Sequence, residues 1–214
     1  MKKIQREDGQ ATREKLLTCA GRLIAAKGYE ATTSKEICEL AGTNLAAVNY
    51  HFGSRDGLYE ELLRIVHQHL MSLDAIQDIE ASDAPPRAKI RRFLATFLRQ
   101  TLIENSWQLR VWARELLHPS PMFADAFTQN IAPKRDLMLR IFAAYTGLSV
   151  EDTRLRGIVI GFMAPFVAVF LVQQDSQYAV VYERERSLIT LVRSLERFAF
   201  AGLDSFVVSR AETE

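Results

Sequence analysis

The sequence predicts an all-α fold, on the strength of three observations. Apolar residues recur at helical spacing along nearly the whole chain. Glycine and proline gather where these periodic stretches end, as is typical of helix termini. No convincing alternation of apolar and polar residues, which would indicate a strand, is present in the sequence. With 214 residues and 48% hydrophobic content, the chain can bury a sizeable core in one large domain or two small ones.

Three short helices are expected first. One spans about residues 12–27. The stretch TSKE, at Thr33–Glu36, is a capping-box pattern that opens a second helix, and this helix should end at Gly42. Asn44 is a good N-cap for a third helix that ends near Phe52.

The remaining elements form a connector and a larger helical bundle. Ser54 caps a connector helix over 54–73, and the stretch 78–89 is the clearest linker. Further helices are expected over about 87–102, 106–117, 122–145 with an interruption at Pro133, 150–173 and 185–203. The apolar run 157–172 should form a helix buried on nearly all sides, because it falls short of the ~20 residues that a bilayer requires.

The predicted domains are a helix-turn-helix domain at 1–55 and a C-terminal domain at 56–214, with the connector helix at their junction. Lys and Arg outnumber Asp and Glu by nine to six in the first segment, whereas the second has eighteen against twenty. This asymmetry is compatible with an N-terminal module that binds phosphate.

The arrangement helix, glycine-containing turn, helix within residues 33–52 is that of a helix-turn-helix motif. Val48 and Phe52 should face inward and leave four residues at or near the exposed side: Ala47, Asn49, Tyr50 and His51. An asparagine amide can bond a base edge, while tyrosine and histidine can reach phosphate oxygens. Leu45 shares the helical spacing of Val48 and Phe52, which favours core packing over a contact with thymine methyl groups.

The stretch ATTSKEICELAGTNLAAVNYHFGSRDGLYEEL, residues 31–62, resembles the DNA-binding segment of TetR-family transcriptional regulators. The match covers about residues 12–62, and two positions depart from the family pattern: Thr43 is usually apolar and Arg55 is usually lysine. The stretches TNLAAVNYHFGS, RELLHPSPMF and AAYTGLSVEDTRLR are similar to the subgroup with a CecR-type (YbiH-like) C-terminal domain. The resemblance implies an all-α homodimer with a three-helix DNA-binding domain and a C-terminal ligand-binding and dimerisation bundle.

The residues and the resemblance together predict three sets of contacts. DNA contacts are expected at Thr33, Thr43, Asn44, Leu45, Ala47, Asn49, Tyr50, His51 and Arg55. Ligand contacts are expected at Trp107, Arg110, Arg114, Phe123, Phe127, Phe162 and Phe166, with ordinary aromatic core packing as the alternative. A dimer interface is expected at Gly157, Gly161, Leu188, Leu191, Val192, Leu195 and Phe198, with packing inside one chain as the alternative.

Several other classes are disfavoured. His67 and His69 diverge on a helix, and no acyl-transfer triad or glycine-rich loop after a strand is found, so neither a metal site nor an enzyme is expected. No cofactor is expected either. Cys19 and Cys38 are isolated, and the N-terminus lacks the apolar run of a signal peptide, which together favour a cytoplasmic protein without a membrane segment.

The function predicted from these features is sequence-specific transcriptional regulation. The resemblance implies a homodimeric repressor that a small-molecule effector releases from a palindromic double-stranded DNA operator. The alternatives are a small-molecule-responsive activator, or a ligand-binding protein without operator specificity.

Overall fold

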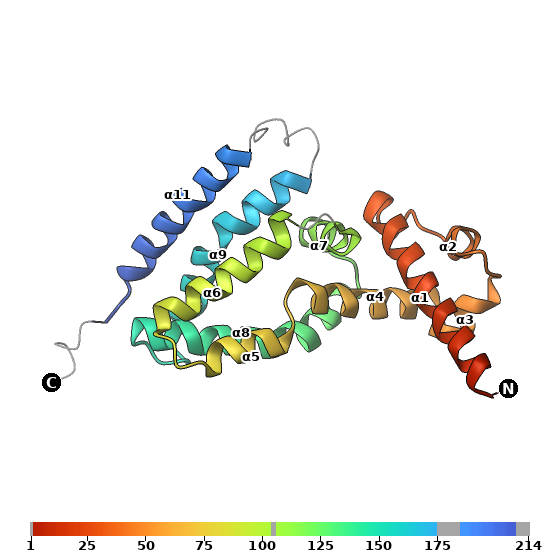
Figure 1. Ribbon diagram of the computed structural model, residues 1–214, viewed down its shortest axis with the longest axis horizontal. Helices are drawn as coiled ribbons and strands as arrows, with labels where there is room; N and C mark the ends of the chain where they lie inside the picture. The colour runs from red at the N-terminus through yellow and green to blue at the C-terminus, as the bar shows by residue number, and fades with distance from the viewer. Residues whose placement is uncertain (1, 104–105, 175–184, 209–214) are drawn as a thin grey trace. The chain divides into compact units, whose positions relative to one another are not determined.

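The computed structural model describes residues 2–103, 106–174 and 185–208 of the chain, and every regular element within these ranges is a helix (Figure 1). The predicted all-α fold is confirmed. The helices form two compact units. Unit 1 comprises Met1–Leu70 and Asn105–Ile131, and unit 2 comprises Met71–Glu104 and Ala132–Glu214.

Unit 1 contains the N-terminal helices and one helix from the middle of the chain. The helices that lie wholly within it are α1 (Lys2–Lys27), α2 (Ser34–Ala41), α3 (Ala46–Phe52), α4 (Arg55–Leu70) and α7 (Trp107–Leu117). Helix α7 packs against both α1 and α4. The predicted boundary after residue 55 therefore differs from the boundary between the units, because α4 and α7 pack with the N-terminal helices.

Helix α1 begins at Lys2, about ten residues earlier than predicted. The polar stretch before residue 12 offers no apolar face, but it also contains no proline that would end a helix. Gln10 donates a hydrogen bond of 2.9 Å to Glu14, one turn later, which supports the helix at this point.

The capping box at the start of α2 is confirmed. The Glu36 backbone N–H donates to Thr33 Oγ1 at 3.3 Å, and the Thr33 backbone N–H donates to Glu36 Oε2 at 2.9 Å. Lys27 Nζ lies 2.5 Å from Glu36 Oε1. The hydrogen bond from Lys27, followed by those from Thr33, lowers the pKa of Glu36 to about 2.

Ser54 caps α4 as predicted, since its Oγ accepts from the Gly57 backbone N–H at 2.9 Å. Helix α4 ends at Leu70 rather than near residue 73. The reason lies in Ser72, whose Oγ accepts from the Ala75 backbone N–H at 3.2 Å and opens a separate helix, α5 (Leu73–Ala81).

Unit 2 contains α5, α6 (Pro86–Leu98), the π-helical turn η1 (Arg99–Ile103), the later part of α8 (Phe123–Thr146), α9 (Thr153–Gln174) and α11 (Glu185–Asp204). The predicted linker over 78–89 is wrong at both ends, because it falls partly in α5 and partly in α6. The interruption predicted at Pro133 is also wrong, since α8 continues through this residue. Proline has no backbone N–H, so α8 lacks one hydrogen bond at Pro133. The side chain of Pro133 is exposed, and the helix continues on both sides of it.

An aromatic cluster forms the core of unit 2. The ring of Phe162 lies 5.2 Å from the rings of both Phe142 and Phe200, in edge-to-face arrangements. The three side chains are no more than 3% exposed. They join α8, α9 and α11, so α11 is attached to the unit by buried aromatic contacts.

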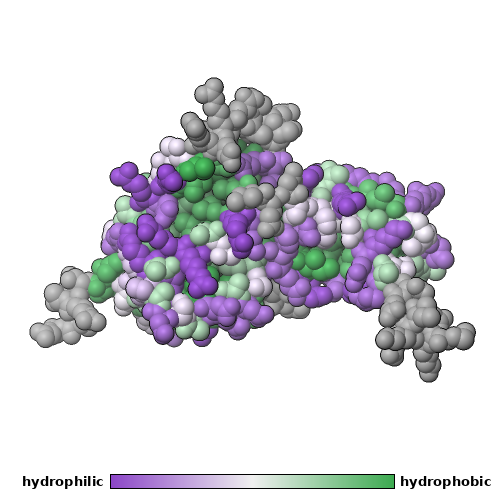
Figure 2. All heavy atoms as spheres, in the orientation of Figure 1, coloured by the Kyte–Doolittle hydropathy of each residue, from purple (hydrophilic) through white to green (hydrophobic). Residues whose placement is uncertain are grey.

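Helix α9 differs from its prediction in length and in burial. It has 22 residues and is long and apolar enough by composition to cross a membrane, but only 33% of its most apolar 18-residue stretch is buried. Gly157 and Gly161 are exposed, and Ile160 is 68% exposed, so the expectation of a helix buried on nearly all sides is wrong. Figure 2 shows apolar side chains at the surface over the upper parts of α9 and α11.

Unit 1 should lose stability in acid through Glu61, which is hydrogen-bonded to Arg64 and ion-paired with Arg13 at 2.8 Å. The hydrogen bond from Arg64 is the main reason why the pKa of Glu61 falls from 4.5 to about 2. A carboxyl with a lowered pKa stabilises the fold above its unfolded pKa, and this contribution disappears as pH falls towards 2. Because the pair is partly exposed, we expect a loss of about 1 kcal/mol in the free energy of unfolding. Urea unfolding of the wild type and of Glu61→Gln between pH 5 and about pH 2.5 should show this step in the wild type only.

Candidate nucleic-acid interface

The turn between α2 and α3 is built around Gly42. This residue has φ = 63°, a left-handed conformation that side chains with a Cβ rarely adopt. Its N–H donates to Glu39 O at 3.2 Å, and the Thr43 N–H donates to Cys38 O at 2.9 Å. These bonds satisfy the last carbonyls of α2 and redirect the chain into α3.

One side of α3 is anchored and the other is open. Val48 is 1% exposed, and on α2 Ile37 and Ala41 are both fully buried. Asn49 is exposed, and Tyr50 is 85% exposed, the largest exposed fraction among the exposed large hydrophobic side chains. The predicted outward direction of Asn49 and Tyr50 is therefore confirmed, and α3 presents a face of low charge.

His51 and Phe52 occupy the end of α3 and are half-buried. The His51 ring packs edge-on against Tyr50, with centroids 4.9 Å apart. The Arg13 guanidinium lies 5.2 Å from the centre of the Phe52 ring, so α1 holds the end of α3 in place. Ala47 is half-buried beside these residues.

The start of α3 differs from its prediction. The helix begins at Ala46, two residues after Asn44, although Asn44 Oδ1 still accepts from the Ala47 N–H at 3.2 Å. Leu45 lies in the turn before the helix and is 56% exposed. The core position favoured for Leu45 is therefore wrong, because the helical spacing from which it was argued begins only at the next residue.

The hydroxyl groups of Thr43 and Thr33 have different surroundings in the protein. Thr43 Oγ1 is buried and has no hydrogen-bond partner among the residues that the structure describes. Thr33 Oγ1 donates to Glu36 Oε2 at 2.8 Å as part of the capping box. Neither hydroxyl is presented to a phosphate in this arrangement.

Replacing Thr43 by valine should raise the free energy of unfolding by about 1 kcal/mol, because the change removes a buried hydroxyl group without a partner and keeps the side-chain shape. Urea unfolding measures the change in stability, and fluorescence anisotropy with operator DNA should give an unchanged affinity. As a matched control, Thr33→Val should lower stability by about 1 kcal/mol, because its hydroxyl caps α2. A loss of affinity in Thr43→Val would instead identify a DNA contact.

Arg55 is held by the protein more firmly than predicted. Its Nη1 donates to Thr32 O at 2.9 Å, its Nε donates to the Tyr29 hydroxyl oxygen at 3.1 Å, and its guanidinium lies 4.2 Å from the centre of the Tyr29 ring. Nη2 takes no part in these bonds. Arg55 therefore organises the loop before α2, in addition to any contact that it makes with a phosphate.

Lys35 is a cationic residue at this surface that sequence reasoning missed. Its side chain is 80% exposed on the first turn of α2, and its ion pair with Glu39 is long, at 3.9 Å. The signal was available, since a lysine directly after the capping residues of a helix-turn-helix lies beside free backbone N–H groups that attract anions.

The predicted ligand residues do not form one cluster. Trp107 and Arg114 pack against α1 instead, since the Trp107 ring lies against Gly21, and Arg114 donates to Ala25 O at 3.0 Å and Ala26 O at 2.6 Å. Phe123 contacts the ring of His67 in unit 1, and Arg110 is exposed on α7. Phe162 and Phe166 belong to the core of unit 2, and the side chain of Phe127 lies outside the described residues.

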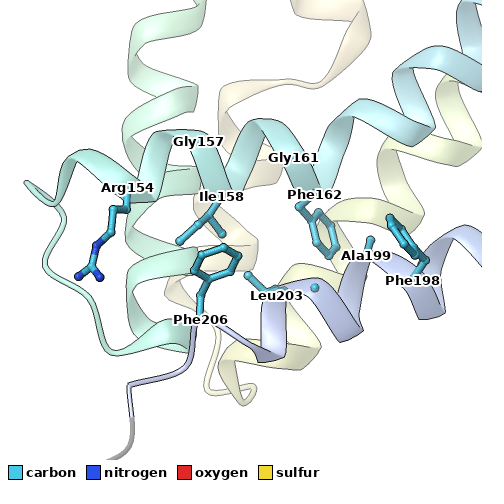
Figure 3. A pocket seen from close by; sticks show the side chains of 10 residues that line it. Arg154, Gly157, Ile158, Gly161, Phe162, Phe198, Ala199, Leu203 and Phe206 are labelled. Atoms are coloured by element: carbon cyan, nitrogen blue, oxygen red, sulfur yellow. The ribbon is translucent and has the colours of Figure 1, made fainter. Parts of the chain in front are cut away.

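Three of the predicted dimer residues, Gly157, Gly161 and Phe198, line an apolar groove on unit 2. The groove has a volume of about 410 Å³ and lies between α9 and α11, where Figure 3 shows Phe206 next to Ile158 at one end and Phe198 beyond Phe162 at the other. Phe198 is 72% exposed, and a Cβ built on Gly157 or Gly161 meets no atom within 4 Å. The four remaining predicted residues are half-buried on α11: Leu188, Leu191, Val192 and Leu195.

No group of three or more His, Cys, Asp or Glu side chains that could hold a metal ion occurs within the described ranges. Cys19 and Cys38 are both buried and unbonded to one another.

Comparison with known proteins identifies the family. The model described as bacterial regulatory proteins, tetR family, matches residues 16–62, which include the later part of α1, all of α2 and α3, and the first half of α4. The model described as the C-terminal domain of the HTH-type transcriptional dual regulator CecR matches residues 86–203, more than half of the 214 residues. The chain belongs to the TetR family and carries a CecR-type C-terminal domain.

Two relatives of this TetR-family protein are named transcriptional regulators. The HTH-type transcriptional dual regulator CecR of Shigella flexneri is 29% identical over 157 residues, which cover 69% of this chain and 70% of that protein. The HTH-type transcriptional regulator BetI of Burkholderia thailandensis is 30% identical over 112 residues, 50% of this chain and 56% of that protein. The predicted resemblance is confirmed, and the chain is a DNA-binding transcriptional regulator whose relatives are regulators rather than enzymes.

Proposed function

We propose that this TetR-family regulator is a homodimer that places α3 of each protomer against a palindromic operator. The observation that carries the proposal is the exposed, weakly charged end of α3, where Tyr50 is 85% exposed beside the exposed amide of Asn49. A small side chain such as Ala47 in the first turn of α3 allows close approach to the base edges, and Tyr50 and His51 reach the phosphates. Exposed Lys35 supplies positive charge at the start of α2.

The second copy is proposed to cover the groove between α9 and α11. Exposed small and apolar residues recur along α9 at helical spacing, from Gly157 through Ile160 and Gly161 to Ala164. Such a stripe permits close backbone approach of another helix. Phe198, which is 72% exposed on α11, extends the same apolar surface. A two-fold axis through this surface brings four helices together and separates two reading helices for successive major grooves, about 34 Å apart.

The proposed regulation is release from the operator by a small-molecule effector bound to the C-terminal domain, in the cytoplasm. Of the predicted ligand residues, Phe162 and Phe166 remain candidates, since they belong to the aromatic cluster of unit 2. An effector that binds better when the reading helices are spread would lower operator affinity by its differential binding, typically ~5–150-fold.

A second candidate is a regulator that both activates and represses. The name of the Shigella flexneri relative includes the words dual regulator, and its C-terminal domain type matches residues 86–203 of this chain. Reporter genes with the operator placed upstream of, or overlapping, the promoter would distinguish the two modes of action.

The experiment that tests DNA binding is selection of bound sequences from random duplexes, followed by anisotropy measurements on the selected operator. Tyr50→Ala should weaken binding by about ten-fold or more while leaving the dimer intact, because the contact lies at the protein surface. Leu40→Ala is a suitable control, since this side chain is 53% exposed on α2 rather than on α3. A wild-type protein that selects no sequence, or a Tyr50→Ala variant with wild-type affinity, would contradict this mode of binding.

A further inference from the structure

Glu115 is a buried acid that the DNA-binding surface does not use. It lies on α7 and is 4% exposed. Its Oε1 accepts from the Tyr59 hydroxyl at 2.5 Å, and its Oε2 accepts from both the backbone N–H and the hydroxyl of Ser120 at 2.9 Å. A buried carboxylate that is left without such donors is costly, so these three bonds fix the residues that make them.

Tyr59 continues the contact towards the DNA-binding surface. Its ring is stacked on that of Tyr29, with centroids 4.4 Å apart, and it is 1% exposed. The Arg55 guanidinium lies 4.2 Å from the centre of the same Tyr29 ring. At these distances the Tyr59 ring and the Arg55 guanidinium must lie on opposite faces of the Tyr29 ring, so Tyr29 is held between Arg55 and Tyr59. Burial of Tyr59, reinforced by Glu115, raises the pKa of its phenol, which keeps the donating proton in place.

The contacts of Tyr29 and Arg55 extend to the start of α2. The Tyr29 hydroxyl donates to Asp56 and accepts from Arg55 Nε, and Arg55 Nη1 donates to Thr32 O at 2.9 Å. Thr32 directly precedes the residue that caps α2. We use the name buried column for Arg55, Tyr29, Tyr59, Glu115 and Ser120, all of which belong to unit 1.

Arg114, next to Glu115, adds a second connection. It donates to Ala25 O and Ala26 O, which are among the last carbonyls of α1. Residues 114–120 therefore hold both the end of α1 and, through Tyr59, the middle of α4. These two helices flank α2 and α3 in the sequence, so a displacement of residues 114–120 acts on both ends of the DNA-binding element.

Helix α8 begins three residues after Ser120, at Phe123. Its residues up to Ile131 belong to unit 1, and those from Ala132 belong to unit 2. The segment that completes the buried column is thus followed directly by the one helix, among those described, that contributes to both units.

We propose that Glu115 is the positioning residue through which the segment between α7 and α8 controls DNA binding: its bonds to Tyr59 and Ser120 keep Tyr29 and Arg55 in the arrangement that orients α2 and α3. The inference rests on the proposed DNA binding. A displaced segment 118–121 withdraws Ser120, Tyr59 loses its fixed partner, and the fraction of molecules with a correctly oriented reading surface falls. Apparent operator affinity falls in proportion to that fraction.

The test compares two small deletions within the column. Ser120→Ala removes the hydroxyl donor to Glu115 Oε2 and leaves the backbone N–H donor, and Tyr59→Phe removes the only donor to Oε1 among the described residues while keeping the stacked ring. Each should lower operator affinity about five-fold or more at a temperature where both variants are fully folded. Because both substitutions act through Glu115, the double variant should bind the operator no more weakly than the single variant with the lower affinity does. Glu61→Gln is the matched control. It breaks the ion pair between Arg13 of α1 and Glu61 of α4 and the pair between Glu61 and Arg64 within α4, both outside the column, and its effect should simply multiply with that of Ser120→Ala.

A contact that only stabilises the fold would lower the melting temperature without changing affinity, and that result would overturn the proposal, as would multiplicative effects of Ser120→Ala and Tyr59→Phe. Hydrogen exchange provides a measurement that needs no DNA. In Ser120→Ala, the backbone amides of Glu36 and Ile37 should exchange at least five-fold faster than in Glu61→Gln. If the wild type binds no DNA, the proposed function fails, yet faster exchange at α2 would still support the coupling and unchanged exchange would refute it.

Discussion

Replacing Gly161 by glutamate should separate the proposed dimer into monomers. The residue lines the groove between α9 and α11, as Phe198 does. A Cβ at this position would have no atom within 4 Å. The protomer can therefore accept the side chain, whereas a second copy covering the groove would bury an unpaired carboxylate. Burial of such a charge costs at least ~3 kcal/mol, which corresponds to dimers about 100-fold weaker or more.

Sedimentation equilibrium measures the dimer dissociation constant, and anisotropy with the palindromic operator should report a parallel loss, because one reading helix cannot span two half-sites. Gly9→Glu is a matched control, since Gly9 is also helical and has no atom within 4 Å of a Cβ. It should remain dimeric. A Gly161→Glu protein that sediments as a dimer at the same concentration would place the interface elsewhere.

Replacing Gly21 by alanine should destabilise unit 1 by about 2 kcal/mol. A Cβ at this position would lie 2.3 Å from Cε3 of the Trp107 ring, closer than real carbon atoms approach. Either the ring or the helices must move, and such overpacking costs about 1–3 kcal/mol, more than the ~1 kcal/mol that alanine offers over glycine in a helix. Thermal or urea unfolding measures the difference.

Two comparisons isolate the contact. Gly9→Ala, in the same helix and in open space, should stabilise the protein by up to about 1 kcal/mol. In a Trp107→Ala background, Gly21→Ala should become stabilising too, because the obstructing ring is absent. A penalty that persists without the ring would mean that α1 and α7 are kept apart at Gly21 by something other than Trp107.

Local features of the fold were predictable wherever the deciding groups lie within one helical turn. The capping box of Thr33 and Glu36, the left-handed Gly42 and the cap at Ser54 all appear as predicted. The two caps depend on side chains that bond a backbone N–H three residues later, and the end of α2 depends on the conformational freedom of glycine. The open face of α3 was predictable too, because Val48, the one buried residue of this seven-residue helix, fixes which side points outward.

Predictions that depended on distant residues fared differently. Trp107 and Arg114 share a helical face, which suggested a ligand site, yet the face is occupied by α1, some eighty residues earlier in the sequence. The burial predicted for α9 was wrong because hydrophobicity indicates what must be covered, not whether the same chain covers it. Leu45 was misplaced by an error of one residue in the start of α3.

The sequence by itself determined that this protein is helical, that residues 33–52 form a helix-turn-helix, and that the chain resembles TetR-family regulators, because caps, turns and periodicity are written in neighbouring residues. Only the tertiary structure decided that Tyr59 donates to Glu115, 56 residues later, that Arg55 donates to the loop before α2, and that α9 has an exposed apolar face. Those outcomes depend on which surfaces approach one another in space. Because hydrophobic packing is non-directional, the apolar pattern of one helix does not specify which other helix packs against it.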